Sequence, residues 1–373
     1  MNVLIIAPMF YPDKSVGALR MTSLARFLIN KGVNLWVLTN KKEVTEIDFK
    51  AQYVFVDSIK TGNFLTEYQN NRERYVSAFE TLTDTVEIDA IIISGGPFYT
   101  FHIAIEARKK KIKCFLDFRD PWIFDRRENT YGLKNLIRKA YYLPEERKAV
   151  GAATLVVTVT DRWVQTFQRY YPSCRAKFRL IENGFDDGQL SMLRKAELQK
   201  EKRITLAVFG KLFYYTDKYS KVFTKALKKY TNDISVLQVG QREEQVNRIL
   251  EQFGLDQCSI KSTGFIQYSS GMEILMNADC FLIIDARKDA IGTKIYDYIF
   301  LGKPIIYVGP KDSYISDMIR QYGLGYSCDS SEKVERAFNR LLSHGYHSDI
   351  DENLKVHFAR SHQNEKWWEL LNG

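Results

Sequence analysis

The sequence lacks the usual features of membrane-spanning, disulfide-linked and metal-binding chains. Its 373 residues contain no apolar run approaching the ~20 residues that a membrane-spanning helix needs. The first residues, Met1 to Ile6, have no basic segment and indicate a first strand, not a signal peptide. Five cysteines are scattered without CxxC spacing, so we expect reduced core thiols in a cytoplasmic protein. The five histidines have no metal-ligand spacing either.

A dinucleotide-binding fingerprint is also absent. The first apolar run, 3–7, leads into PMFYPD, and Gly17 stands alone after it. Neither half of the chain has a G-x-G-x-x-G after its first predicted strand. A nicotinamide or flavin enzyme is therefore disfavoured.

Positive charge is unevenly distributed. The net charge is +9, and residues 102–179 contain 18 Lys/Arg against 8 Asp/Glu, with dense parts at 108–111 and 126–127. Such a patch suits an anionic membrane surface, a phosphorylated substrate or nucleic acid. For 108–111 alone, a solvated helix end is the favoured interpretation. No nucleic-acid-binding motif is present, which disfavours a nucleic-acid partner.

Short β-rich runs alternate with amphipathic stretches along most of the chain. Helical patterns occur at 18–30, 67–82, 99–109, 220–230 and 242–253. The predicted strands are 3–7, 35–39, 53–56, 90–94, 113–117, 154–158, 204–209, 235–239, 259–263, 280–284 and 304–308. This order predicts an α/β protein with doubly wound parallel sheets.

The alternation stops and restarts once, which indicates two domains. A polar segment at 186–202 carries no strand signal, and a chain of this length usually has more than one core. We expect an N-terminal Rossmann-like domain over 1–184 and a second one over 185–354, facing each other across a cleft. Residues 355–373 should pack back on the first domain, and we expect Trp367 and Trp368 to pack there instead of serving as a sugar platform.

Two carboxylates, Asp289 and Asp297, lie eight residues apart across a predicted strand-to-helix turn. Gly292, Thr293 and Lys294 fall where the helix would begin, so their backbone amides should be available to an anion. Asp297 lies about one turn into that helix, within reach of a ribose beside the phosphates. A nucleoside diphosphate explains this segment better than a simple anion.

Several short motifs, in order, resemble those of the retaining, family 4-like glycosyltransferases with two Rossmann-like domains (the GT-B type). Residues 114–122, CFLDFRDPW, resemble the DxRDPW signature of a branch that acts in bacterial surface-polysaccharide assembly. Residues 181–186 are similar to the family's I-P-N-G-V/F-D. Residues 209–211 resemble its G-R/K, and 263–266 its G-x-V/I loop beside the base, which places Ile266 there. Asp289 and Asp297 stand where the family has the two glutamates of its E-x7-E motif.

The resemblance implies roles for the C-terminal half. Asp289 would accept hydrogen bonds from donor-sugar hydroxyls, although an N-cap role is also open. Asp297 would accept from both ribose hydroxyls, the alternative being a solvated helix residue. Lys211 and Lys218 would neutralise the leaving diphosphate, with Lys294 as a third cation. Lys218 needs a shift of one residue, and a surface lysine explains it equally well.

The resemblance also implies roles for the N-terminal half. Gly17 remains from the family's glycine pair near the donor phosphates. Arg119 takes the place of a catalytically linked histidine, and Asp120 would accept or position the acceptor hydroxyl's proton. The alternative is an Arg–Asp pair that shapes the loop. His102 is interpreted as a packed helix residue.

These expectations define a retaining, metal-independent glycosyltransferase without a cofactor. Its donor would be a nucleotide sugar and its acceptor a glycan or a lipid-linked glycan, at the cytoplasmic face of the membrane. Asp349 and Asp351 spell the D-x-D metal motif of another fold, but in a polar loop near the C-terminus, so they are discounted. A nucleotide-sugar 2-epimerase and a non-catalytic scaffold of a polysaccharide-assembly complex remain alternatives.

Overall fold

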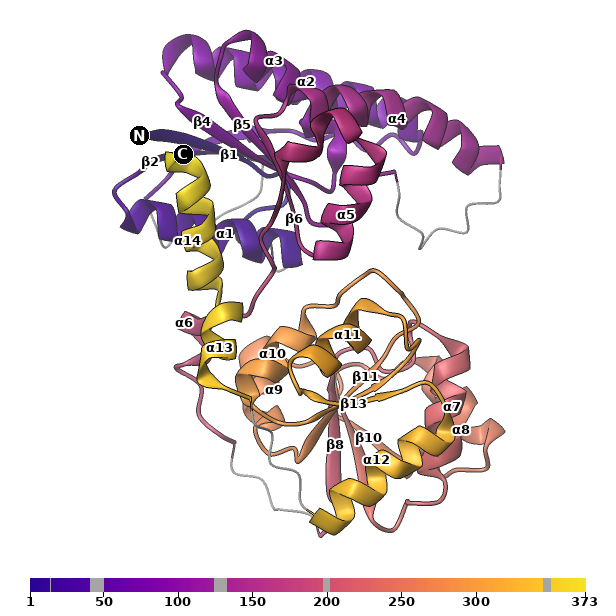
Figure 1. Ribbon diagram of the computed structural model, residues 1–373. Coiled ribbons are helices and arrows are strands. Elements are labelled where there is room, and N and C mark those ends of the chain that lie inside the picture. Colours follow the sequence, from indigo (N-terminus) through magenta and orange to yellow (C-terminus); the bar gives the residue numbers. More distant parts are fainter. Residues whose placement is uncertain (14, 41–49, 124–132, 197–201, 345–349) are drawn as a thin grey trace. The chain divides into compact units, whose positions relative to one another are not determined.

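The computed structural model describes residues 1–13, 15–40, 50–123, 133–196, 202–344 and 350–373 (Figure 1). The chain divides into two compact units. The N-terminal unit comprises Met1–Asn183 and Arg360–Gly373, and the C-terminal unit comprises Gly184–Ala359. Each unit is a parallel sheet with helices on both faces, which confirms the predicted fold class.

The N-terminal unit is built on a seven-stranded parallel sheet. Its strands, in spatial order, are β3 (Gln52–Val56), β2 (Asn34–Asn40), β1 (Asn2–Ile6), β4 (Ala90–Ser94), β5 (Lys113–Phe118), β6 (Leu155–Thr158) and β7 (Phe178–Leu180). Side chains of β1 alternate between two cores, because successive residues of a strand point to opposite faces. One face is covered by α1 (Val16–Asn30) and α14 (Arg360–Asn372). The other is covered by α2 (Phe64–Thr85), α3 (Ile103–Lys109), α4 (Leu133–Ala152) and α5 (Asp161–Tyr170).

The C-terminal unit repeats this plan with six parallel strands. Their order is β10 (Ile260–Ser262), β9 (Ile234–Val239), β8 (Ile204–Phe209), β11 (Cys280–Ile284), β12 (Ile305–Val308) and β13 (Gly325–Cys328). One face packs on α7 (Asp217–Leu227), α8 (Glu244–Gln252) and α12 (Ser331–His344). The other packs on α9 (Tyr268–Leu275), α10 (Lys294–Leu301), α11 (Tyr314–Gln321) and α13 (Glu352–Phe358).

Strand order reverses once in each sheet, and these reversals locate the candidate sites. In the N-terminal unit the reversal lies between β1 and β4, and in the C-terminal unit between β8 and β11. Loops that leave the carboxyl ends of such a strand pair diverge to opposite faces and leave room for a ligand. The loops after β8 and β11 carry Lys211 and residues 285–293.

Two strands were not predicted, and one expectation about the cysteines is wrong. The missed strands are the edge strands β7 and β13, which are only three and four residues long. Cys114, Cys280 and Cys328 are buried, but Cys258 is exposed and Cys174 is half-buried, so the thiols are not all in the core. No described helix is long and apolar enough to cross a membrane.

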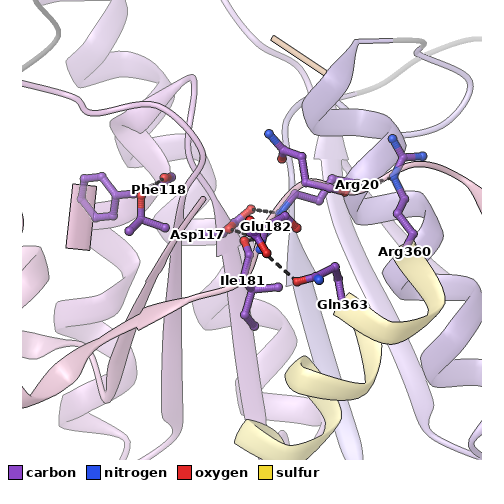
Figure 2. A network of polar contacts seen from close by, with 9 residues as sticks. Arg20, Asp117, Phe118, Ile181, Glu182, Arg360 and Gln363 are labelled. Carbon is purple, nitrogen blue, oxygen red and sulfur yellow. Dashed lines mark hydrogen bonds and ion pairs between the residues drawn. The ribbon is translucent and has the colours of Figure 1, made fainter. Parts of the chain in front are cut away.

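A buried polar network holds the last residues of the N-terminal unit to its sheet (Figure 2). The Arg20 guanidinium donates two hydrogen bonds of 3.1 Å to the Asp117 carboxylate and one each to the carbonyls of Ile181 and Glu182. The Glu182 amide donates to the Gln363 side chain of α14. Arg20 and Asp117 are both buried. The first aspartate of the DxRDPW-like segment is therefore a structural ion-pair partner.

The chain returns to the N-terminal unit at Arg360, after a break between α13 and α14 at Ala359. The sequence had placed this return at about residue 355. Trp367 is 1% exposed and packs in the core beneath α1, which leaves it no open face for a sugar.

Candidate functional site

The beginning of α10 in the C-terminal unit presents unpaired backbone amides beside a lysine. Thr293 is the N-cap residue of α10, and its side chain makes no capping hydrogen bond. Among the described residues, the amides of Gly292, Thr293 and Lys294 have no acceptor, whereas those of Ile295 and Tyr296 bond to the preceding turn. Such amides, together with the helix dipole, form a site for an anion. Asp289 is not the N-cap, so that alternative is wrong.

Lys294 joins the two loops at the point where the strand order reverses. Its ammonium donates a 2.9 Å hydrogen bond to the backbone carbonyl of Lys211, in the loop after β8. The pKa of Lys294 is lowered to about 8, mainly by burial and to a smaller extent by Arg287, against the opposing effects of Asp285 and Glu243. A poorly solvated ammonium at the start of a helix is stabilised when an anion binds beside it.

The Lys211 side chain is exposed, and its ammonium lies 5.4 Å from the centre of the Tyr214 ring. Lys218 is the second residue of α7 and is also exposed, with its ammonium 5.1 Å from the centre of the Tyr219 ring. No contact within the described part of the chain joins Lys218 to Lys211 or Lys294. The structure therefore links Lys211 and Lys294, whereas Lys218 has the environment of a surface lysine.

An arginine and an aspartate that the sequence did not single out line the same region. Asp285 directly follows β11, is buried, and receives hydrogen bonds of 2.6 to 3.1 Å from the Arg287 guanidinium. That guanidinium lies 4.0 Å from the centre of the Tyr215 ring. These residues border a cavity of about 20 Å³ together with Gly292 and Lys294. The position of Asp285 directly after a predicted strand was the available signal.

Asp297 is buried in α10 and accepts a 2.8 Å hydrogen bond from the Tyr268 hydroxyl at the start of α9. It is therefore not a solvated helix residue. Tyr268 follows the loop 263–267, in which the Phe265 side chain is 88% exposed and Ile266 packs against the core. Asp297, which we expect to bind the ribose, and the loop that we expect beside the base are thus adjacent in the folded unit.

A Cβ atom added at Gly292 would lie 4.0 Å from the nearest atom beyond its chain neighbours, Nη2 of Arg287. The protein itself therefore does not require glycine at this position. Asp289 lies half-buried in the loop between β11 and α10. The roles of these residues toward a donor remain predictions.

In the N-terminal unit, Gly17 and Arg119 meet beyond the carboxyl ends of β1, β4 and β5. A Cβ atom at Gly17 would lie 1.9 Å from Nη1 of Arg119, and one at Gly96 would lie 3.3 Å from Nη2. The guanidinium therefore occupies space that the two glycines leave open. Arg119 also pairs with the half-exposed Asp120, at 3.6 Å between Nε and Oδ2. This contact fits the loop-shaping alternative and still leaves Asp120 accessible.

His102 lies at the end of a short 3₁₀ helix (Phe98–His102) and contacts Glu145 of α4 at 3.2 Å. This agrees with its interpretation as a packed residue. Asp351 caps α13 through the Asn353 amide. Arg126, Arg127 and Asp349 lie outside the described residues. Within the ranges that are described, no group of three or more His, Cys, Asp or Glu residues is placed to hold a metal ion.

The N-terminal unit also has a cavity of about 590 Å³, which the sequence did not predict. It is bordered by the loops after β4 and β5, by the start of α2, and by the first half of α4. Its size is within the range of small-molecule sites. Arg119 and Asp120 lie in its wall, so this ion pair borders a cavity in addition to lying in the loop after β5.

No family model matches the sequence, and no curated protein matches it. Among solved structures, the whole chain is similar to sucrose-phosphate synthase from Thermosynechococcus elongatus, with 14% identity, a TM-score of 0.71 and 98% of that chain covered. It is similar to HepE of Anabaena in complex with UDP and glucose, with 15% identity, a TM-score of 0.67 and 99% of that chain covered. UDP-GlcNAc 2-epimerase from Methanocaldococcus jannaschii matches the whole chain with 13% identity and a TM-score of 0.62, and 99% of it is covered. Likeness at this identity establishes the fold alone: the chain has the two-domain GT-B fold.

Proposed function

We propose that this protein is a glycosyltransferase that moves a sugar from a nucleoside-diphosphate donor to a hydroxyl of a glycan or lipid-linked acceptor. The observation that carries the proposal is the start of α10, where three backbone amides without acceptors and the Lys294 ammonium lie beside the Lys211 loop. This arrangement suits a diphosphate, whose charge grows when the sugar departs. The HepE structure with UDP and glucose supports the same class of donor.

In this proposal the donor lies across the carboxyl ends of β8 and β11. The amides of residues 292–294, with the Lys294 and Lys211 ammonium groups, stabilise the leaving diphosphate. Asp297, oriented by Tyr268, accepts from the ribose hydroxyls, and Asp289 accepts from the sugar. Asp120 positions the acceptor hydroxyl. We infer front-face substitution with retention, in which the leaving phosphate helps to remove the acceptor's proton.

Asp297 and Asp289 provide the sharpest test of donor binding. Asp297→Asn keeps the shape of the side chain but removes its charge, so it should weaken uridine diphosphate binding about tenfold. Asp289→Asn should leave that affinity unchanged and abolish sugar transfer. Thermal shift measures the two affinities, since a ligand at 100 times its dissociation constant stabilises by about 2.7 kcal/mol, and release of uridine diphosphate measures transfer. Equal affinity in wild type and Asp297→Asn would refute the assignment.

Metal independence follows from the same positive charge, because Lys294, Lys211 and the helix amides take the place of a bound cation. Transfer should persist in excess chelator and should collapse in Lys211→Ala. Loss of activity in chelator, with recovery on adding magnesium or manganese, would contradict this part of the proposal.

A nucleotide-sugar 2-epimerase is the second candidate, because the M. jannaschii 2-epimerase has the same fold. An epimerase would convert a UDP-sugar to its C2 epimer without releasing UDP, whereas a transferase releases UDP only with an acceptor. Product analysis by NMR separates the two. Nucleotide binding with neither reaction would favour the scaffold role.

We further propose a role in cell-surface polysaccharide assembly at the inner face of the membrane. This rests on the resemblance of residues 114–122 to the DxRDPW signature and on the basic excess of residues 102–179.

A further inference from the structure

The 590 Å³ cavity of the N-terminal unit has an apolar wall made mainly of aromatic rings. Trp122 stacks on Phe98, with ring centres 5.2 Å apart and planes within 6°, and Tyr68 and Tyr142 lie within 6 Å of it. With so many ring neighbours, Trp122 is not an open platform for a sugar. Aromatic and aliphatic side chains thus make up much of the wall, a surface that suits hydrocarbon better than hydroxyls.

The apolar wall continues to an exposed helix surface. Leu136 of α4 lines the cavity and is 59% exposed, and the next residue, Ile137, is 49% exposed. These two adjacent aliphatic side chains extend the apolar surface from the cavity onto the outside of α4.

Positive charge lies in the same wall. Arg119, Arg138 and Lys139 line the cavity, against the carboxylates of Asp120 and Glu67. Asp120 is paired with Arg119, and Glu67 accepts from the Thr61 amide at 3.4 Å. Arg138 and Lys139 directly follow the exposed Leu136 and Ile137 on α4. Cations at the edge of an apolar cavity suit a ligand with a hydrocarbon part and an anionic head.

We propose that this cavity binds a single-chain lipid phosphate, with the hydrocarbon against the aromatic wall and the phosphate at Arg119, Arg138 and Lys139. Resting on the proposed function, this identifies the acceptor as lipid-linked instead of a soluble glycan. The hydrocarbon chain leaves along Leu136 and Ile137.

Farnesyl phosphate, used below its micelle concentration, is the probe. Its binding to the full-length protein is measured by calorimetry and by tryptophan fluorescence, to which Trp122 contributes. We expect it to bind at least about tenfold more tightly than farnesol, which lacks the phosphate, and than inorganic phosphate, which lacks the chain. Equal binding of farnesol or of inorganic phosphate would overturn the proposal, as would no binding of farnesyl phosphate.

Matched variants locate the site. Leu136→Asp places a charge in the apolar wall and should weaken farnesyl phosphate about tenfold. Leu342→Asp makes the same change at a 40% exposed leucine of α12, outside the cavity, and should have no effect. Equal effects of the two leucine changes, or none from either, would refute the assignment.

Uridine diphosphate binding is measured on the same samples and separates this inference from the proposed function. If uridine diphosphate binds but farnesyl phosphate does not, the lipid-phosphate cavity is refuted and the donor site stands. If only farnesyl phosphate binds, the cavity is supported and the transferase proposal fails.

Discussion

The affinity for a nucleoside diphosphate should fall as the pH rises through the pKa of Lys294. In the ligand-free protein, burial lowers this pKa to about 8. A bound diphosphate favours the charged ammonium and raises the pKa again. The charged fraction of Lys294 in the free protein falls from about nine-tenths at pH 7 to about one-tenth at pH 9. The affinity should therefore fall about tenfold, or about 1.4 kcal/mol, over this range.

Calorimetry with uridine diphosphate at pH 7, 8 and 9 measures this change. The last phosphate ionisation of the ligand, near pH 6, lies below this range, so the charge of the diphosphate changes little between pH 7 and pH 9. Binding at pH 9 should also take up nearly one proton, which is seen when the heat of binding depends on the buffer.

Lys294→Arg is the control, because a guanidinium stays charged throughout this range. Its affinity for uridine diphosphate should change less than about twofold between pH 7 and pH 9. An equally steep decline in Lys294→Arg, or a flat profile in wild type, would refute the assignment of Lys294 to the diphosphate.

Three further predictions concern stability and membrane attachment. Asp117→Ala leaves Arg20 buried without its carboxylate and should lower the free energy of unfolding by about 3–5 kcal/mol, as measured by urea titration. The control Asp312→Ala breaks the exposed pair with Lys288 and should lower it by less than about 1 kcal/mol. Burial raises the pKa of Glu146 to about 7, so folding favours the protonated form of this carboxyl. Its contribution to the free energy of unfolding is therefore complete below about pH 4.5 and is lost as the pH rises through 7. Glu146→Gln should remove this decline and stabilise the protein at pH 8 by up to about 3 kcal/mol; an unchanged slope between pH 5 and pH 8 would contradict it. Because salt screens exposed charges, flotation with anionic liposomes should succeed at low salt and weaken at high salt, and failure at low salt would leave the basic region without a membrane role.

The sequence alone was enough to predict the two parallel α/β domains. Buried parallel strands and amphipathic helices leave periodic apolar patterns that can be read locally, and the predicted bounds of β4, β8 and β11 agree with the structure. The edge strands β7 and β13 were missed because three and four residues are too few to show a periodic apolar pattern.

Local sequence also identified the start of α10. Gly292, Thr293 and Lys294 present backbone amides without acceptors, because helix geometry leaves the first amides unpaired whatever the rest of the fold does. The hydrogen bond from Lys294 to the Lys211 carbonyl could not be read in this way, since 83 residues separate the two and only sheet topology brings them together.

Tertiary structure alone decided which charged residues are structural and where the cavity lies. Asp117 and Asp120 stand three residues apart in one motif, yet Asp117 is buried against Arg20 while Asp120 borders a cavity, because Asp117 lies within β5 and Asp120 lies in the loop that follows it. The cavity itself combines α2, α4 and the loops after β4 and β5, segments up to 80 residues apart. Periodicity along a chain reports which residues are buried, but it carries no information about which distant segments meet, and that depends on the packing of the whole unit.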